Sequence, residues 1–104
     1  MALNTRNYMP DHGIRVPATV HESFAAQLLR AAGLAADGAT QVARILAACD
    51  TRCVFSHGTK RMGEEYLREL QEGSINAHPG VRAERQDGGT AVIDGDGGLG
   101  YHAC

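Results

Sequence analysis

One short stretch, residues 56–61, carries the side chains best suited to acid chemistry on a small molecule: a hydroxyl, an imidazole and two cations. Histidine donates and accepts protons near neutral pH, and the arginine fork matches a carboxylate at two points. His57 and Arg61 are four residues apart, so both project from one face if a helix begins at or before His57. Such a pair can hold a 2-oxo acid by its carboxylate and protonate the adjacent carbonyl as a hydride arrives. The competing interpretation is a serine N-cap, Ser56, followed by solvated charges.

A glycine-rich segment, residues 94–100, supports two further hypotheses. Gly95, Gly97 and Gly100 fit the G-x-G-x-x-G spacing of a phosphate-binding loop that follows a strand. The segment lacks the Lys-Ser/Thr of a P-loop, and its aspartates would repel a phosphate. The spacing of those two aspartates suggests a calcium loop, but the third acidic position and the glutamate of an EF-hand are missing. We therefore interpret the segment as a strand-to-helix turn.

Cys49, Cys53 and His57 are spaced four apart and would share one face of a continuous helix. Zinc needs a fourth ligand and usually a C-x-x-C pair, and Thr51 and Phe55 weaken a continuous helix here. We therefore predict no metal site and at least half-buried thiols. The remaining histidines are scattered and receive no role: His12, His21, His78 and His102.

Two helices must support the 56–61 stretch. After an irregular lead-in at residues 1–18, the T-x-x-E spacing from Thr19 to Glu22 matches a capping box and predicts a helix start at Thr19. A second start is predicted at Asp37, a good N-cap. Only a few residues join the two helices, which favours antiparallel packing. Their apolar stripes are Phe24, Ala25, Leu28, Leu29, Ala31 and Ala32, then Val42, Ile45, Leu46 and Cys49.

A third helix is predicted from about Thr59 to Glu72, closed by Gly73, which completes a helical region over residues 19–73. Met62, Tyr66 and Leu70 line one face of this helix at spacing four.

Residues 74–104 change character. After a linker-like turn, residues 81–85 alternate with period two, and a D-G-G turn leads to a more apolar return strand at 90–94, which we expect to be more buried. An isolated hairpin is marginal in water and needs a sheet or a helical face to lie on. The fold class is therefore α+β: a three-helix N-terminal region, then the start of a β-sheet. We expect the front part of a longer protein.

Composition narrows the function classes. The 104 residues suffice for one domain, and an apolar fraction of 43% supports a globular core. A net charge of −2 gives no electrostatic case for nucleic-acid binding. No stretch approaches the run of about 18 apolar residues that spans a bilayer. The polar start predicts no signal peptide, and three cysteines without disulfide-framework spacing suit a reducing compartment, so we expect a cytoplasmic protein.

Five stretches occur in an order and spacing far more specific than any single motif. They are Ala47-Ala48-Cys49-Asp50-Thr51-Arg52, Ser56-His57-Gly58 with Arg61, residues 66–70, Gly73-Ser74-Ile75-Asn76 and residues 90–100. In these stretches the chain, from about Val16 to its end, resembles the N-terminal part of the malate/L-lactate dehydrogenase family. These oxidoreductases use NAD(P) without a Rossmann fold and include sulfolactate and ureidoglycolate dehydrogenases.

The resemblance implies a role for three residues. The histidine that matches His57 lies in the family's active site and acts in some members as the proton donor. The arginine that matches Arg61 engages the substrate carboxylate, and the serine that matches Ser56 lies beside them. The resemblance also implies NADH or NADPH as cofactor, held mostly by downstream segments, together with a homodimer, no metal, and a small 2-hydroxy or 2-oxo acid as substrate.

Three departures from the family pattern stand out. Cys53 occupies a position where the family usually has glycine, so this residue is strained if its φ is positive. The stretch between Arg61 and Gly73 is one residue longer than usual, so Tyr66 is shifted and receives no site role. The chain also ends before the cofactor site and before a downstream histidine and lysine that several members use.

We therefore expect an N-terminal fragment of an NAD(P)-dependent oxidoreductase that interconverts small 2-hydroxy and 2-oxo acids, inactive on its own. The alternative is a catalytically inactive helical interaction module derived from such an enzyme. That module would expose an apolar patch where the missing sheet docked.

Overall fold

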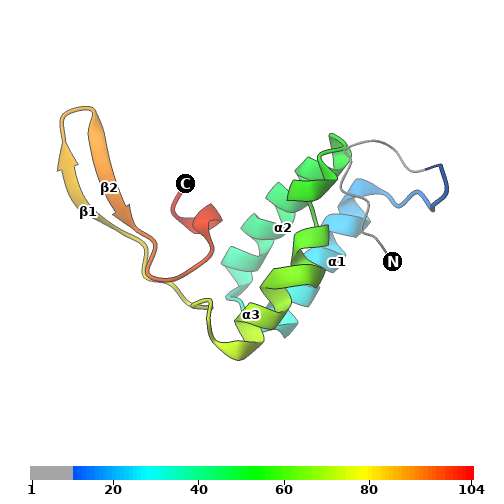
Figure 1. The fold of residues 1–104 in the computed structure, drawn as a ribbon, viewed down its shortest axis with the longest axis horizontal. Helices are drawn as coiled ribbons and strands as arrows, with labels where there is room; N and C mark the ends of the chain where they lie inside the picture. The colour runs from blue at the N-terminus through cyan, green and yellow to red at the C-terminus, as the bar shows by residue number, and fades with distance from the viewer. Residues whose placement is uncertain (1–10) are drawn as a thin grey trace.

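The computed structural model describes residues 11–104, and the first ten residues of the predicted lead-in lie outside the described residues. The elements are α1 (Ala18–Ala31), α2 (Ala36–Thr51), the 3₁₀ turn η1 (Phe55–His57), the π-helical turn η2 (Met62–Tyr66), α3 (Leu67–Glu72), β1 (Arg82–Asp87), β2 (Thr90–Asp94) and the 3₁₀ turn η3 (Gly100–His102). The predicted α+β class is confirmed. Figure 1 shows the helices gathered at one end of the molecule and the hairpin projecting at the other.

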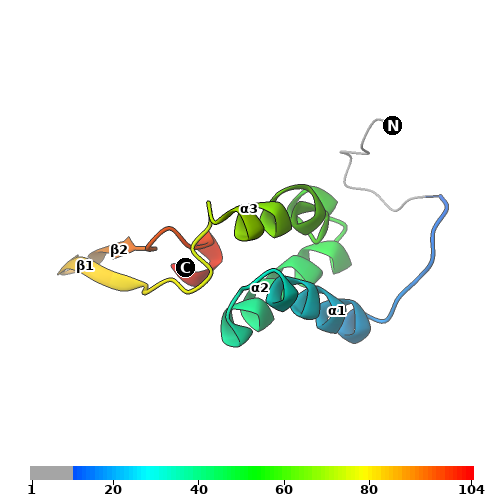
Figure 2. The ribbon, with the colours of Figure 1, turned by 90° about the horizontal axis from the view of Figure 1, so that it is seen from below.

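The core lies between α1 and α2, which run side by side in opposite directions (Figures 1 and 2). Its largest fully buried side chains are Leu29, Val42 and Leu46. Alanines fill much of the rest, and their small size lets the two backbones approach closely. Phe24, which we expected in the apolar stripe, is 58% exposed, because α1 packs through the face one residue further on, at Ala25 and Leu29.

Both helices begin earlier than predicted, α1 at Ala18 and α2 at Ala36, and the N-cap of α2 is Ala35, so the N-cap predicted at Asp37 is wrong. Pro17 precedes α1, and no side chain caps the helix, so the capping box predicted at Thr19 is wrong. Thr19 lies inside the first turn, and the N–H of His21 donates to the Pro17 carbonyl at 3.0 Å. Asp37 lies in the first turn of α2, where its negative charge favours the positive end of the helix dipole. Within residues 11–104, no helix is long and apolar enough to cross a membrane.

The third predicted helix is present, but one turn of it is π-helical. Helical geometry runs from Lys60 to Glu72, and η2 interrupts it with i→i+5 bonding over Met62–Tyr66. Such a single π-helical turn within a helix widens it locally by about one residue. Met62 and Leu70 point into the core, and Gly73 closes the helix at a φ of 81°.

The hairpin is antiparallel and pairs Arg82 with Asp94 and Asp87 with Thr90. The expectation that β2 would be the more buried strand is wrong, since both strands are exposed and Val92 is 56% exposed. Within residues 11–104, no third strand pairs with the hairpin. Figure 2 shows it extending away from the helices.

The glycine-rich segment folds back onto residues 76–80 and closes the base of the hairpin. Asp96, at a φ of 52°, accepts hydrogen bonds on its carboxylate from the Gly80 N–H at 2.9 Å and from Asn76 Nδ2 at 3.2 Å. Gly98 lies so close to Pro79 that an added Cβ would be 2.6 Å from its Cγ. The segment therefore acts as a turn from β2 into η3.

Candidate active site

The structure brings Ser56, His57 and Arg61 into one corner. Ser56 and His57 lie in η1, and Arg61 lies in the first turn of the helical stretch that follows, which begins at Lys60. Ser56 Oγ is 2.9 Å from His57 Nδ1, and Arg61 Nε donates to the Ser56 carbonyl oxygen at 3.2 Å. When Nδ1–H donates to the Ser56 hydroxyl oxygen, Nε2 carries a proton in the imidazolium and is an acceptor in the neutral imidazole. The ring of His57 is exposed, so that this proton is available to a small molecule.

Arg61 also makes a contact that the sequence analysis did not identify. Its Nη1 donates to Glu65 Oε2 at 3.1 Å, one helical turn away. The Glu65 carboxylate, and to a lesser extent Tyr66, raises the pKa of the Arg61 guanidinium above its ordinary value. Both side chains of the pair remain partly exposed.

Tyr66 extends the corner to the end of the chain. Its hydroxyl lies 3.0 Å from the hydroxyl of Tyr101 in η3, and the two rings meet edge to face with centroids 6.2 Å apart. Burial, followed by this hydrogen bond, raises the pKa of Tyr66 well above its ordinary value. Because the two tyrosines lie 35 residues apart, spacing along the chain gives no sign of this pair.

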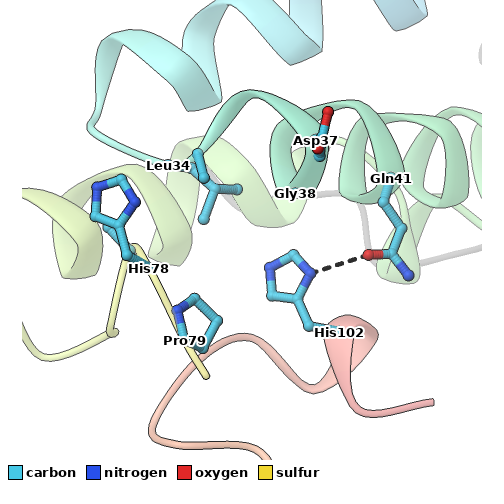
Figure 3. Close-up of a pocket in the computed structure, with 9 residues that line it drawn as sticks. Leu34, Asp37, Gly38, Gln41, His78, Pro79 and His102 are labelled. Atoms are coloured by element: carbon cyan, nitrogen blue, oxygen red, sulfur yellow. Dashed lines mark hydrogen bonds between the residues drawn. The ribbon is translucent and has the colours of Figure 1, made fainter. Parts of the chain in front are cut away.

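A cavity separate from the Ser56–His57–Arg61 corner lies beside η3, the turn that contains Tyr101. It encloses about 370 Å³ between the start of α2, residues 77–79 and η3 (Figure 3). His102 Nδ1 lies 3.0 Å from Gln41 Oε1, and an added Cβ at Gly38 would lie 2.9 Å from His102 Cε1. Nε2 of His102 is buried without a hydrogen-bond partner in the part of the chain that the structure describes. Different residues line this cavity and the Ser56–His57–Arg61 corner.

A polar network of His21, Asp50 and Thr59 joins three helical segments next to the Ser56–His57–Arg61 corner. Asp50 Oδ2, near the end of α2, accepts from His21 Nε2 at 2.8 Å, from the Thr59 N–H at 3.2 Å and from the Thr59 hydroxyl. His21 comes from α1, and Thr59 directly precedes the helical stretch of Arg61. His21, to which we assigned no role, thus belongs to the support of the site. Its contact spans 29 residues, which periodicity does not reveal.

This network is not a nucleophilic triad. In a triad, the acid and the nucleophile contact opposite nitrogens of the imidazole ring. Here Asp50 and Thr59 both face Nε2 of His21, at 2.8 and 3.1 Å. The network therefore positions residues 58 and 59 and does not activate Thr59.

Two residues between the end of α2 and the helical stretch of Arg61 have a close contact or an unusual backbone conformation. An added Cβ at Gly58 would lie 1.7 Å from Asp50 Oδ1, so only glycine fits against the carboxylate. Cys53 has a φ of 60°, so the expected strain at a position usually occupied by glycine is confirmed.

Neither the cysteines nor the glycine-rich segment forms a ligand cradle. α2 ends at Thr51, so Cys49, Cys53 and His57 do not share a helix face. Within residues 11–104, no three His, Cys, Asp or Glu side chains converge in a way that could hold a metal ion. In the glycine-rich segment, the amide of Asp96 donates to Asp94 Oδ1, and the amide of Gly98 donates to the Gly95 carbonyl.

Comparison with known proteins places these residues in context. The family model "Malate/L-lactate dehydrogenase" matches residues 16–104. The malate dehydrogenase of Pyrococcus horikoshii is 37% identical over 95 residues, which is 91% of this chain and 26% of that protein. Its solved structure superposes with a TM-score of 0.83 at 35% identity and covers 97% of this chain and 29% of that one.

Two further relatives carry other names. The L-sulfolactate dehydrogenase of Methanocaldococcus jannaschii is 34% identical over 70% of this chain, and the ureidoglycolate dehydrogenase (NAD(+)) of Escherichia coli is 32% identical over 83% of it. The chain spans only 21% and 24% of their lengths. The family match over most of the chain and the superposition agree, and we conclude that this chain belongs to the malate/L-lactate dehydrogenase family.

Proposed function

We propose that this chain supplies the substrate-binding corner of an oxidoreductase that interconverts small 2-hydroxy and 2-oxo acids. The observation that carries the proposal is the double contact of Ser56, whose hydroxyl pairs with His57 and whose carbonyl oxygen accepts from Arg61. One residue thus couples a proton-transfer group to a carboxylate-binding group. A 2-oxo acid requires both, because its carboxylate and its reacting carbonyl are on adjacent carbons.

Each residue then has a chemical task. Arg61 binds the substrate carboxylate by charge-assisted hydrogen bonds. His57, as the imidazolium, gives its Nε2 proton to the carbonyl oxygen during reduction and becomes the neutral imidazole, whose Nε2 accepts a proton from the hydroxyl during oxidation. Ser56 accepts a hydrogen bond from Nδ1–H of His57 on its hydroxyl oxygen, which orients the ring and leaves Nε2 as the nitrogen that gains and loses the proton.

The glycine-rich segment does not fit a dinucleotide. The glycine-rich segment uses its own amides internally and presents the carboxylate of Asp96, which would repel a pyrophosphate. We assign the cofactor, NADH or NADPH, to the part of the protein that corresponds to the remaining three quarters or so of the relatives. We therefore propose that the 104 residues are inactive alone, that the complete protein is a homodimer, and that it acts in the cytoplasm, where the thiols of Cys49, Cys53 and Cys104 stay reduced.

A chimera tests this proposal. Residues 16–104 would replace the matching first part of the Pyrococcus horikoshii malate dehydrogenase, since the two backbones superpose with a TM-score of 0.83. We expect the chimera to oxidise NADH or NADPH in the presence of a 2-oxo acid such as oxaloacetate or pyruvate. A chimera that unfolds cooperatively, as the parent does, and yet reduces no 2-oxo acid would contradict the proposal.

A second candidate function is an interaction module without activity. It is favoured by apolar side chains on the outer face of α1, where Val20 and Phe24 are both more than half exposed, and by the uncovered hairpin. Sedimentation of the isolated chain distinguishes the two. Self-association that Phe24→Ser abolishes would support the module, and a monomer at all concentrations would argue against it.

A further inference from the structure

The donors of Arg61 are already partly engaged. A guanidinium can take a carboxylate along two edges, one formed by Nε and Nη2 and the other by Nη1 and Nη2. Nε donates to the Ser56 carbonyl at 3.2 Å, and Nη1 donates to Glu65 Oε2 at 3.1 Å. The Nε donor is therefore occupied, and Nη1 on the other edge already donates one of its two N–H groups to the Glu65 carboxylate. A substrate carboxylate at either edge therefore meets an existing partner, and it binds more tightly when one of these partners leaves.

Glu65 is the partner that can leave. The Ser56 carbonyl belongs to the backbone of η1. Gly58, which directly follows η1, packs tightly against the Asp50 side chain. Glu65 is a side chain that is 42% exposed, and exposed pairs at this helical spacing are weak and screened by salt. Releasing Glu65 therefore costs little, whereas moving the Ser56 carbonyl would distort the turn.

Glu65 reaches Arg61 at the ordinary helical spacing of four residues. Glu64 and Glu65 both lie within η2, but they have different partners. Glu64 pairs with Lys60 at 3.7 Å, and Glu65 pairs with Arg61 at 3.1 Å. The two glutamates have similar exposure, 37% and 42%, so they form a matched pair of which only one touches Arg61.

We propose that Glu65 is an internal competitor for the substrate carboxylate at Arg61 and lowers the affinity of the site for 2-oxo acids. The inference rests on the proposed function, because it requires that the substrate carboxylate binds Arg61. In the free protein Glu65 occupies one donor of the guanidinium, and on binding the substrate carboxylate takes that donor. Glu65 is thus an affinity-determining residue.

Titration of the full chain with pyruvate tests the inference. The Nε–H resonance of Arg61 in the ¹⁵N-labelled chain, followed at low salt, reports binding at this side chain directly. We expect Glu65→Gln to lower the dissociation constant about two- to fivefold, the range set by a weak exposed ion pair. Glu64→Gln, the matched control, should leave it unchanged. Pyruvamide, which lacks the carboxylate, should show no difference between the variants.

The outcomes separate the inference from the function on which it rests. If pyruvate moves the Arg61 resonance with equal dissociation constants in the Glu65→Gln variant and the unmodified chain, the competitor role is wrong and the carboxylate-binding role stands. If pyruvate leaves the resonance unmoved in the unmodified chain and in both variants, the carboxylate-binding role of Arg61 is itself contradicted. Equal melting temperatures of the two variants would exclude a folding effect.

Discussion

Nε of Arg61 donates a hydrogen bond of 3.2 Å to the carbonyl oxygen of Ser56, five residues earlier in the chain. This bond ties the first turn of a helix to the 3₁₀ turn before it. The hydroxyl of Ser56 lies 2.9 Å from Nδ1 of His57, so a single residue contacts both side chains that we propose bind a 2-oxo acid.

Replacing Arg61 with lysine should weaken substrate binding in the chimera. Lysine keeps the charge but loses the planar fork and the Nε donor to Ser56. Losing one charge-assisted hydrogen bond corresponds to an increase of about 10- to 100-fold in KM for the 2-oxo acid. Steady-state kinetics at saturating cofactor measure this, and an unchanged KM would mean that the carboxylate binds elsewhere.

Replacing His57 with alanine should reduce kcat about 10²- to 10⁴-fold, the usual contribution of a positioned general acid. KM should change much less, since Arg61 carries the carboxylate. His78→Ala is the matched control, because this exposed histidine lines the cavity of Figure 3 instead of the corner. A His57→Ala variant with near-normal kcat would assign the proton transfer to another residue.

Gly58 and Asp50 should be strongly coupled in stability. Gly58→Ala places a Cβ 1.7 Å from Asp50 Oδ1, and we expect a loss of about 1–3 kcal/mol in the free energy of unfolding. In an Asp50→Ala background the same change should cost much less, because the clashing carboxylate is gone. Urea unfolding of the four chains gives the coupling energy, which we expect to exceed about 1 kcal/mol. Additive effects would show that the carboxylate does not pack against Gly58.

Cys53→Gly should stabilise the chain by about 0.5–1 kcal/mol. The φ of 60° costs a non-glycine residue about 1–2 kcal/mol, and part of the gain is offset by the greater entropy of glycine in the unfolded state. Cys53→Ala removes the thiol but keeps the strained backbone, so it should give no comparable gain. Thermal unfolding of both variants measures the difference, and equal melting temperatures would place the effect in the thiol instead of the backbone.

The alkaline stability of the chain should depend on Tyr66. Burial and the Tyr101 hydroxyl hold the pKa of Tyr66 above its ordinary value of about 10. Above about pH 10 the unfolded chain loses this proton before the folded chain does, so the free energy of unfolding falls as pH rises. The contribution is fully present below that pH. Tyr66→Phe cannot ionise, and urea unfolding from about pH 9 to 11 should show a shallower decline. Identical slopes would contradict the buried phenol.

Spacing along the chain predicted the parts of the site whose contacts are local. Ser56, His57 and Arg61 lie within six residues and do meet, but they do not share one helix face, because the helix begins only at Lys60 and the contacts run through Ser56. The strain at Cys53 was also accessible, because a cysteine in place of a usual glycine points to a positive φ. The start of α1 was harder to predict, since Pro17 takes the N-cap position and the capping box expected at Thr19 does not form.

Contacts between distant residues could not be predicted in this way. His21 meets Asp50 across 29 residues, and Tyr66 meets Tyr101 across 35. Both contacts arise because packing brings separate elements together, which no single periodicity encodes. The Arg61–Glu65 pair, in contrast, has the i,i+4 spacing of a helix and could have been predicted, whereas the π-turn over Met62–Tyr66 has no such local signal.

The most direct test is a crystal structure of the chimera with oxamate, an unreactive analogue of pyruvate. The account predicts that the oxamate carboxylate lies about 3 Å from the Arg61 guanidinium, with its carbonyl oxygen at a similar distance from Nε2 of His57. The side chain of Glu65 should then have turned away from Arg61. Oxamate bound to other residues, with the Ser56–His57–Arg61 corner empty, would contradict the account.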